Sequence, residues 1–386
     1  MDSVFNMLNM DEIIFFSCGS HFCICVCKNE VFSWGSNYNG QLGIGNQDNQ
    51  SSPQQISFFK NIEEIISLCC GYDFCICVCT NGVFSWGNNN FGQLGIGNKI
   101  CQSSPQQISF FKNTEEIISI SCGHYFSICI CKNGVFSWGD NYYGQLGIEN
   151  DYTQYSLQKI LFFQNSEEII SLSCGDYFCV CICTNGVFSW GSNCHGQLGI
   201  GTKIHRSSPQ QITFFENPEE IIFLSCGGSF SICVCKNGVF SWGYNGYGQL
   251  GIGNKINQYS PQQILFFENP ELIISLFCGS NFSICICKNG IFSLGYNGYR
   301  QLQLEIENNH NHSFPYPIFT QEKIESFYNL SFPLSYIDQK RKEKIILLIL
   351  EREYSNPDDS LFGKYYLPRD LFKTLLNLVS HKKNIL

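Results

Sequence analysis

The chain contains 386 residues, of which 44% are hydrophobic and only 14% are charged, and its formal net charge is −9 with a pI of about 5.3. This composition excludes a disordered chain, because disordered chains are rich in charge and poor in apolar residues. The negative charge makes nucleic acid and anionic membranes unfavourable partners. The apolar runs are much shorter than the roughly 18–20 residues that cross a bilayer, so no membrane span is expected.

The N-terminus and the charge distribution bear on location and organisation. The first five residues lack the basic start and the long apolar stretch of a secretory signal, so we expect an intracellular protein, cytoplasmic or nuclear. Residues 331–386 hold 10 Lys or Arg and 7 Asp or Glu, a net +3, and subtracting this from −9 leaves −12 for residues 1–330. The sequence therefore has an acidic body and a mildly basic tail.

One motif recurs along the body with constant spacing. Trp-Gly, or Leu-Gly in the last copy, occurs every 52 residues, and Cys-Gly and Gly-Gln-Leu-Gly keep the same phase. The Trp-Gly positions are Trp34, Trp86, Trp138, Trp190, Trp242 and Leu294. A strict internal period of this length is typical of proteins built from stacked structural repeats.

Each copy contains four short segments rich in Ile, Val, Phe and Trp and bounded by Gly, Pro and Asn, which predicts four strands. In residues 105–149 these segments begin Ser-Pro-Gln-Gln-Ile, Glu-Glu-Ile-Ile, Phe-Ser-Ile-Cys and Val-Phe-Ser-Trp. Asn-Gly joins the last two segments in five copies and is the strongest short signal for a tight hairpin. Repeated four-stranded antiparallel units of this size predict the blades of an all-β propeller.

The pattern Cys-Gly-x-x-Phe, then Asn-Gly-Val-Phe-Ser-Trp-Gly and Gly-Gln-Leu-Gly, resembles the regulator of chromosome condensation repeat family over about residues 10–315. The resemblance implies a β-propeller, usually of seven blades. One departure is systematic. The usual His after Cys-Gly is replaced by Phe22, Phe74, Phe126, Phe178, Phe230 and Phe282. Any polar contact that this His makes in the family is therefore expected to be absent.

The number of blades is left open by the sequence. The first copy lacks a Ser-Pro-Gln-Gln-Ile strand, and residues 313–318 look like a displaced copy of it. That strand either completes the first blade and closes a ring of six, or opens a degenerate seventh blade through residues 324–350. We favour seven blades on the family resemblance. The propeller is assigned to residues 1–335, as six repeats and a degenerate closing segment, and a C-terminal tail to residues 336–386.

The tail departs from the repeat and is expected to be α-helical. Residues 338–353 have a helix-forming composition, and the apolar positions of residues 371–379 form one helical stripe. The start of this stripe resembles, over about a dozen residues, the Leu-Pro-x-x-Leu opening of an F-box, which docks a ubiquitin-ligase adaptor. The candidate docking residues of the tail are Leu367, Leu371, Phe372 and Leu375. Capping of the propeller is the alternative, and we favour it.

Most of the 24 cysteines lie in the third strand of each copy, as Cys129 and Cys131 do. Same-face Cβ atoms along a strand are roughly 6.5–7 Å apart, whereas a disulfide requires about 3.8 Å. We therefore predict that these cysteines are small buried apolar residues, neither bridged nor bound to metal. No cofactor is expected. Cys194, in a loop beside His195, is the one thiol singled out as a candidate for reactivity.

Residues shared by every copy serve the architecture, so a partner-binding surface is expected where the copies differ. The loop after Trp-Gly keeps Asn at its second position, which predicts a structural side chain bonding its own turn, while its aromatic residues vary. The pair after Cys-Gly also varies. The candidate partner-binding residues are Tyr38, Phe91, Tyr142, Tyr143, His195, Tyr244, Tyr247, Tyr296 and Tyr299 in the loops and His21, Asp73, His124 and Asp176 in the pairs. Packing of tyrosines between loops is the alternative.

Acidic residues precede the Ile-Ile segment of each copy, and repetition is expected to place them in a circle on one side of the disk. Solvation of strand ends and attraction of a basic partner are the two explanations.

No phosphate-binding or nucleophile motif occurs, so we expect a non-enzymatic, monomeric scaffold that presents variable loops to a protein partner. A guanine-nucleotide exchange factor for a small GTPase and a substrate-recognition subunit of a ubiquitin ligase are the alternatives. The constant 52-residue phase leaves no room for the inserted wedge of an exchange factor of this family. All five tryptophans lie in Trp-Gly, which leaves none for the clusters of an ultraviolet photoreceptor of similar fold.

Overall fold

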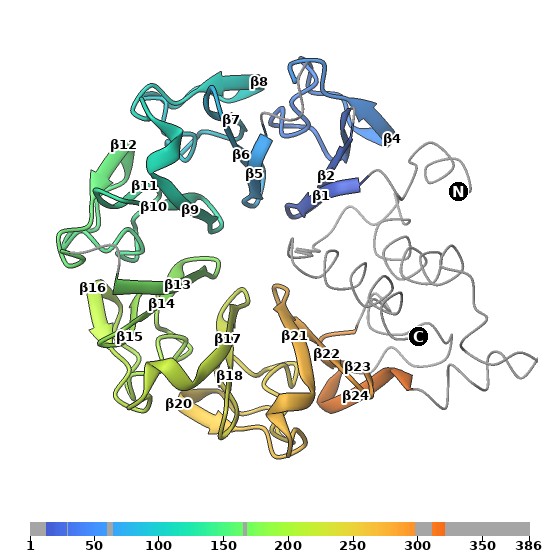
Figure 1. The fold of residues 1–386 in the computed structure, drawn as a ribbon, viewed down its shortest axis with the longest axis vertical. Helices are drawn as coiled ribbons and strands as arrows, with labels where there is room; N and C mark the ends of the chain where they lie inside the picture. The colour runs from blue at the N-terminus through green and yellow to red at the C-terminus, as the bar shows by residue number, and fades with distance from the viewer. Residues whose placement is uncertain (1–12, 29, 60–64, 165–167, 298–310, 321–386) are drawn as a thin grey trace, which may run out of the picture.

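The computed structural model describes residues 13–28, 30–59, 65–164, 168–297 and 311–320. These residues form six four-stranded antiparallel sheets that follow one another around a central axis in chain order (Figure 1). In each sheet every strand pairs with the next strand of the chain, the first strand lying nearest the axis and the fourth at the periphery. The chain is thus a β-propeller, and each sheet is one blade.

Blades I to III comprise the first twelve strands. Blade I contains β1 (Ile13–Cys18), β2 (Phe22–Cys27), β3 (Val31–Gly35) and β4 (Gln50–Gln55). Blade II contains β5 (Ile65–Cys70), β6 (Phe74–Cys79), β7 (Gly82–Gly87) and β8 (Gln102–Gln107). Blade III contains β9 (Ile117–Cys122), β10 (Phe126–Cys131), β11 (Gly134–Gly139) and β12 (Gln154–Lys159), with the short 3-10 helix η3 (Thr114–Glu116) before β9.

Blades IV to VI repeat the same order. Blade IV contains β13 (Ile169–Cys174), β14 (Phe178–Cys183), β15 (Gly186–Gly191) and β16 (Arg206–Gln211). Blade V contains η5 (Pro218–Glu220), β17 (Ile221–Cys226), β18 (Phe230–Cys235), β19 (Gly238–Gly243) and β20 (Gln258–Gln263). Blade VI contains η6 (Pro270–Leu272), β21 (Ile273–Cys278), β22 (Phe282–Cys287), β23 (Gly290–Gly295) and β24 (His312–Thr320).

The strand expected from residues 313–318 neither completes the first blade nor opens a seventh. It is part of β24, which pairs with β23 as the outer strand of blade VI. The reason is that the Ser-Pro-Gln-Gln segment of each copy closes the blade before it, so blade I already has its own outer strand, β4. The favoured seventh blade, through residues 324–350, and the helical tail lie outside the described residues.

The strand register gives the propeller two faces. In blade III, Cys131 pairs with Gly134 at the Asn-Gly hairpin, and β9 starts at this end. At the other end Phe126 pairs with Gly139, next to the Cys-Gly turn and the loop after Trp-Gly. We call these ends the hairpin face and the loop face. Gly134 has a φ of +142°, which L side chains rarely adopt, so this hairpin needs its glycine.

The repeated tryptophans fill the space between neighbouring blades. Trp86 of blade II is fully buried against Phe22, Ile24 and Leu42 of blade I. Its indole N–H donates to the backbone carbonyl of Gln41 at 3.0 Å. The equivalent bonds, at 2.8–2.9 Å, join Trp138 to Gln93, Trp190 to Gln145 and Trp242 to Gln197. Each of these bonds ties one blade to the loop of the blade before it, so the tryptophans are architectural.

All 24 cysteines lie in the described residues, and none is in a disulfide bond. In each blade two thiols of the second strand touch, with Sγ atoms 3.3–3.7 Å apart. These Sγ atoms lean toward one another more than the Cβ spacing suggests, but a disulfide bond is about 2.05 Å long. Burial raises the pKa of Cys77 and Cys181 well above the usual value, which suppresses the reactive thiolate. The buried cysteines of these strands therefore serve as packing groups.

Candidate functional site

The loops of the loop face are held in shape by the asparagine at the second position after Trp-Gly. In blade II the Asn89 side chain is fully buried; its Oδ1 accepts from the amide of Leu94 at 3.0 Å, and its Nδ2 donates to the carbonyls of Asn98 and Ile100 at 2.9 and 3.2 Å. The same bond from the amide of the leucine five residues later is accepted by Asn37, Asn141, Asn193 and Asn245. The structural role predicted for this asparagine is confirmed, and the variable side chains beside it project from a rigid frame.

Backbone hydrogen bonds tie the pairs after Cys-Gly to one another around the axis. The amide of Tyr72 donates to the carbonyl of His124 at 3.2 Å, and the amide of His124 donates to the carbonyl of Asp176 at 3.0 Å. The other bonds of this series run from Ser20 to Tyr72, from Asp176 to Gly228 and from Gly228 to Ser280, at 2.9–3.1 Å. The first residue of each pair is therefore fixed beside its neighbours, so side chains of adjacent blades meet.

Aromatic side chains of blades II to IV form a continuous stack at this position. The rings of Tyr72 and His124 stack with centroids 3.9 Å apart, and those of His124 and Tyr177 with centroids 5.1 Å apart. Tyr125 lies edge-on to His124 at 4.0 Å and stacks on Phe91 at 4.9 Å. His124 is only 3% exposed, whereas the three tyrosines are half-buried and keep part of their surface open to solvent. We call these five residues the aromatic cluster.

Acidic side chains flank the aromatic cluster. Asp73 accepts hydrogen bonds from the side-chain amides of Asn39 and Gln41, each at 3.3 Å. Asp176 is largely buried. Asp140, in the loop after Trp-Gly of blade III, is also buried, and burial raises the pKa of its carboxyl group. Three carboxyl groups thus border the aromatic surface.

The field in the aromatic cluster is negative. Burial, together with the charges of Asp73, Asp176 and Asp140, raises the pKa of Tyr125. Burial and the same charges of Asp176 and Asp140 raise the pKa of Tyr177. Both phenols therefore stay neutral and keep their protons at physiological pH. A cation entering this region gains from the nearby carboxylates and from the ring faces.

The aromatic cluster is not repeated around the ring. The corresponding pairs of blades V and VI are Gly228-Ser229 and Ser280-Asn281, although their strands have the same lengths and registers. The small residues of blades V and VI show that a blade folds without aromatic side chains at these positions. Aromatic side chains at these positions are therefore not required for a blade to fold.

A second aromatic group lies in the loops of blades IV to VI. The rings of His195 and Tyr244 are 4.8 Å apart, those of Tyr244 and Tyr247 are 5.9 Å apart, and those of Tyr247 and Tyr296 are 4.8 Å apart. All four side chains are partly exposed. Burial, and then the charge of Lys203, lowers the pKa of His195, so its ring stays neutral near pH 7.

The structure places every described candidate on the loop face. Those in or against the aromatic cluster are His21, Asp73, Phe91, His124, Tyr143 and Asp176. Tyr38 and Tyr142 are outlying, with exposed fractions of 72% and 74%. The candidates outside the described residues are Tyr299, Leu367, Leu371, Phe372 and Leu375.

Three members of the aromatic cluster, Tyr72, Tyr125 and Tyr177, were missing from the candidate set. They stand in the same variable pairs as the chosen residues, so the signal for them was present. His205 was missed because it belongs to no motif. Its Nδ1 accepts the amide of Asn193 at 2.9 Å, and its ring lies 5.0 Å from that of Tyr143.

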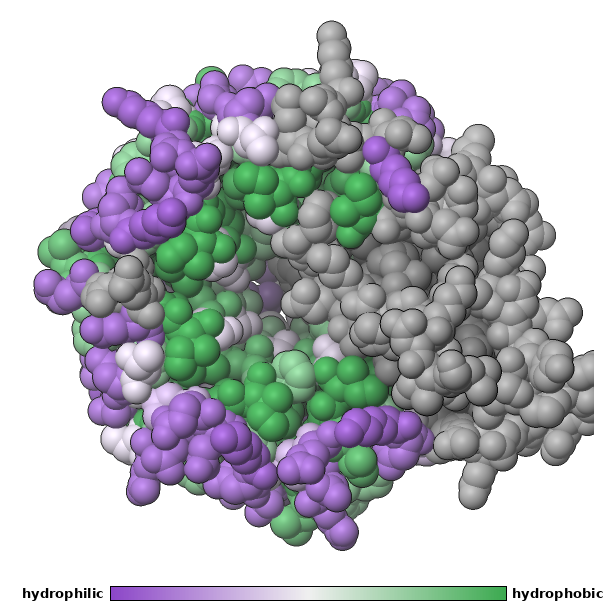
Figure 2. All heavy atoms as spheres, in the orientation of Figure 1, coloured by the Kyte–Doolittle hydropathy of each residue, from purple (hydrophilic) through white to green (hydrophobic). Residues whose placement is uncertain are grey.

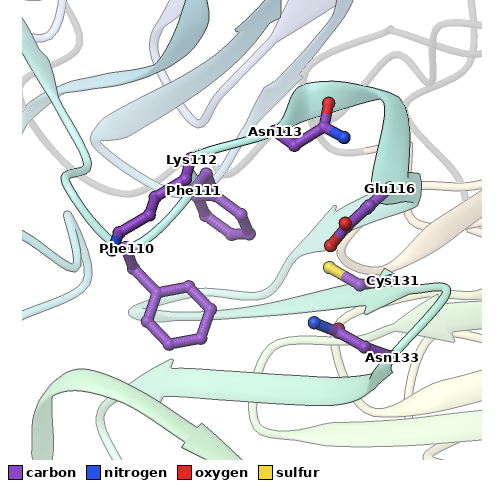
Figure 3. Close-up of a pocket in the computed structure, with 7 residues that line it drawn as sticks. All are labelled: Phe110, Phe111, Lys112, Asn113, Glu116, Cys131 and Asn133. Carbon is purple, nitrogen blue, oxygen red and sulfur yellow. The ribbon is translucent and has the colours of Figure 1, made fainter.

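The hairpin face has a different character. The predicted acids lie there at the starts of the inner strands, with Glu115 and Glu116 in η3 and Glu219 and Glu220 in η5. Blade III also has a recess of about 300 Å³ between the turn at Phe110 and Phe111 and the hairpin at Asn133. The carboxyl group of Glu116 projects into this recess (Figure 3). No group of three or more His, Cys, Asp or Glu side chains in the described ranges is arranged to hold a metal ion.

The six repeated blades form a β-propeller with shared Trp-Gly and Gly-Gln-Leu-Gly loops. The variable loops and pairs described above lie on its loop face. The family model described as RCC1-like domain matches residues 3–330, and the chain belongs to this family. This confirms the resemblance found from the repeat motif. Within the described part of the chain, no helix has the length and apolar character of a membrane span.

Several relatives share this domain. The chain is 30% identical to the ultraviolet-B receptor UVR8 of Arabidopsis thaliana, over 64% of this chain and 57% of that protein. It is 32% identical to the probable E3 ubiquitin-protein ligase HERC6 of Homo sapiens, over 67% and 26%, and 30% identical to the human X-linked retinitis pigmentosa GTPase regulator, over 73% and 28%. The chain thus spans between about a quarter and about a half of these relatives.

Solved structures show the same fold. Human WBSCR16 superimposes with a TM-score of 0.67 at 24% identity, over 81% of this chain and 83% of that chain. Yeast RCC1 (Prp20), in its structure bound to Kap60, gives a TM-score of 0.67 at 20% identity, over 82% and 77%. At these identities the likeness establishes the architecture and not the activity.

Proposed function

We propose that this RCC1-like protein is a non-enzymatic scaffold that binds a protein partner through its loop face, with the aromatic cluster at the centre of the contact. The observation that carries the proposal is the asymmetry among otherwise equal repeats. Blades II to IV place aromatic and acidic side chains at positions that blades V and VI fill with Gly, Ser and Asn, and blade I contributes His21 beside Tyr72. A structural role would be needed equally in every blade.

The chemistry of the aromatic cluster favours a basic segment of the partner. An Arg or Lys side chain gains from the faces of Tyr125 and Tyr177 and from the carboxylates of Asp73 and Asp176. Tyrosine also buries a large apolar area at small entropic cost, as interfaces require. Because the attraction is partly electrostatic, we expect the complex to weaken as the salt concentration rises.

The proposed scaffold acts as a monomer in the cytoplasm or nucleus. The absence of disulfide bonds among the 24 cysteines supports this location, because thiols persist without disulfides in reducing compartments.

Regulation of a small GTPase is the second candidate. It is favoured by the kinship with a protein named as a GTPase regulator and by the fold shared with Prp20, a yeast protein studied for its binding to Gsp1p and histones. Against nucleotide exchange, the loops between the third and fourth strands of blades I to V keep one length and contain no inserted wedge. A third candidate, substrate recognition within a ubiquitin ligase, draws on the partial matches to HERC6 and HERC2.

The test is capture of partners from native lysate by the full-length chain. One variant, His124→Ser with Tyr125→Asn, gives blade III the pair of blade VI; the matched control, Ser229→Asn, alters the same position of blade V. We expect a partner that is held by the wild type and the control and lost by the blade III variant. Equal capture by all three proteins would reject the loop-face site. A captured GTPase released by added nucleotide would favour exchange activity.

A further inference from the structure

The inner strand of every blade contains a β-bulge directly after its first residue. In blade III, Ile117 pairs with Cys131 and Ser119 pairs with Ile130, so Ile118 has no partner in the register. The corresponding bulged residues are Ile14, Ile66, Ile170, Ile222 and Ile274. A bulge re-aims a side chain relative to its sheet. Here it turns an isoleucine out of the packing between the blades.

Five of the six bulged isoleucines are exposed, and Ile274 is half-buried, although the other apolar residues of these strands pack between the blades. The exposed fractions are 39% for Ile14, 48% for Ile66, 54% for Ile118, 55% for Ile170 and 42% for Ile222. Because the inner strands surround the axis and start at the hairpin face, these side chains form an arc around the axis from blade I to blade VI, which we call the isoleucine annulus. Figure 2 shows apolar side chains gathered around the axis and hydrophilic ones toward the rim. A contiguous exposed apolar surface marks an interaction site.

We propose that the isoleucine annulus is the docking site of residues 367–379 of the same chain, which present Leu371, Phe372 and Leu375. The predicted helical stripe of this segment supplies the apolar counterpart that the annulus requires. The proposal concerns the face opposite the aromatic cluster and does not depend on the proposed function.

The chain enters and leaves the described propeller on the side of the annulus. Thr320, at the end of β24, pairs with Gly290 at the hairpin of blade VI, and Ile13, at the start of β1, pairs with Cys27 at the same face. The 47 residues from position 321 to position 367 can span up to about 150 Å when extended. The docking segment therefore starts from the correct face and can reach any blade.

The charges of the two surfaces are complementary. Residues 331–386 carry a net +3. The described charged residues of the hairpin face are nine acids, Glu30, Glu115, Glu116, Glu168, Glu216, Glu219, Glu220, Glu268 and Glu271, and six bases, Lys28, Lys112, Lys132, Lys159, Lys236 and Lys288. The resulting surplus of three negative charges favours a basic segment over an acidic one.

The test is photo-crosslinking in the full-length chain, with benzoylphenylalanine in place of Phe372 and an equal mixture of unlabelled and ¹⁵N-labelled protein. We expect crosslinks within single chains, to the peptides that contain Ile118, Ile170 or Ile222. Crosslinks confined to the loop face, crosslinks only between labelled and unlabelled chains, or a yield no higher than with the probe at Tyr142 would each overturn the proposal.

A substitution in the annulus provides the second readout. The double variant Ile118→Asp with Ile170→Asp is expected to lower the crosslink yield at least fivefold, because two carboxylates then face the apolar stripe. Tyr142→Asp, on the opposite face, is the matched control and is expected to leave the yield unchanged. All three positions are more than half exposed, so the blades keep their packing. Equal yields in the two variants would overturn the proposal.

Discussion

The loop frame of the propeller depends on its buried asparagines, and Asn89→Ala tests this dependence. The substitution removes the acceptor of the Leu94 amide and the donor to the carbonyls of Asn98 and Ile100. Leu94 is fully buried, so water cannot replace the lost acceptor, and an unsatisfied buried amide costs about 1–3 kcal/mol. Asn98 and Ile100 are exposed, so water replaces much of the two other bonds.

We expect Asn89→Ala to lower the free energy of unfolding by about 2–4 kcal/mol, the sum of the unsatisfied amide and a partial loss of the two carbonyl bonds. The assay is urea unfolding followed by tryptophan fluorescence in the presence of a thiol reductant. Asn90→Ala, at the exposed neighbouring position, is the matched control and is expected to change this free energy by less than about 0.5 kcal/mol.

Asn89→Asp separates hydrogen bonding from volume, because the two side chains have the same shape. The carboxylate still accepts from the Leu94 amide but turns an oxygen toward the carbonyls of Asn98 and Ile100. We expect it to destabilise the protein at least as much as Asn89→Ala at pH 7. Stability within about 0.5 kcal/mol of the wild type for either variant would refute the account of the loops.

Three further outcomes are expected. Trp138→Leu copies Leu294 of blade VI, but it leaves a cavity and removes the hydrogen bond to the Gln93 carbonyl, so it should lower the free energy of unfolding in urea by about 2–4 kcal/mol. An unchanged free energy of unfolding would contradict the role of tryptophan between blades. Because burial raises the pKa of Asp140, its ionisation opposes folding, and the melting temperature of the wild type should fall as the pH rises through that pKa. Asp140→Asn, which copies Asn88 of blade II, should abolish this decline in melting temperature. A variant whose melting temperature depends on pH as the wild type's does would contradict the assignment. Limiting iodoacetamide should label Cys194 first, because it is the only exposed cysteine; first labelling at any other thiol would contradict the packing role of the rest.

The fold was predictable because the period and the turn signals agree in every copy. The Trp-Gly, Cys-Gly and Asn-Gly positions mark strand ends, and the strands lie where these signals place them. The assignment of outer strands to blades was not predictable from the period, because a repeat can be divided into blades at any turn. Pairing decides that division, and β24 shows that the outer strand belongs to the preceding Leu294-Gly295 strand.

The candidate site was predictable in position but not in detail. Differences between copies drew attention to loops and pairs that the structure places together on the loop face, because the shared residues were already explained by packing. Stacking of Tyr72, His124 and Tyr177 across three blades depends on the backbone bonds around the axis, which no sequence pattern reveals. The bulged isoleucines, such as Ile118, were hidden for a similar reason, since a bulge shifts exposure without changing the apolar pattern.

The claim that the differences between repeats form a binding surface is tested most directly by affinity. The captured partner would be titrated against the wild type and against the variant His124→Ser with Tyr125→Asn, after equal melting temperatures have shown that both are folded. The account predicts at least tenfold weaker binding to the variant, which corresponds to about 1.4 kcal/mol, and weaker wild-type binding at higher salt. Equal affinities at every salt concentration would contradict it.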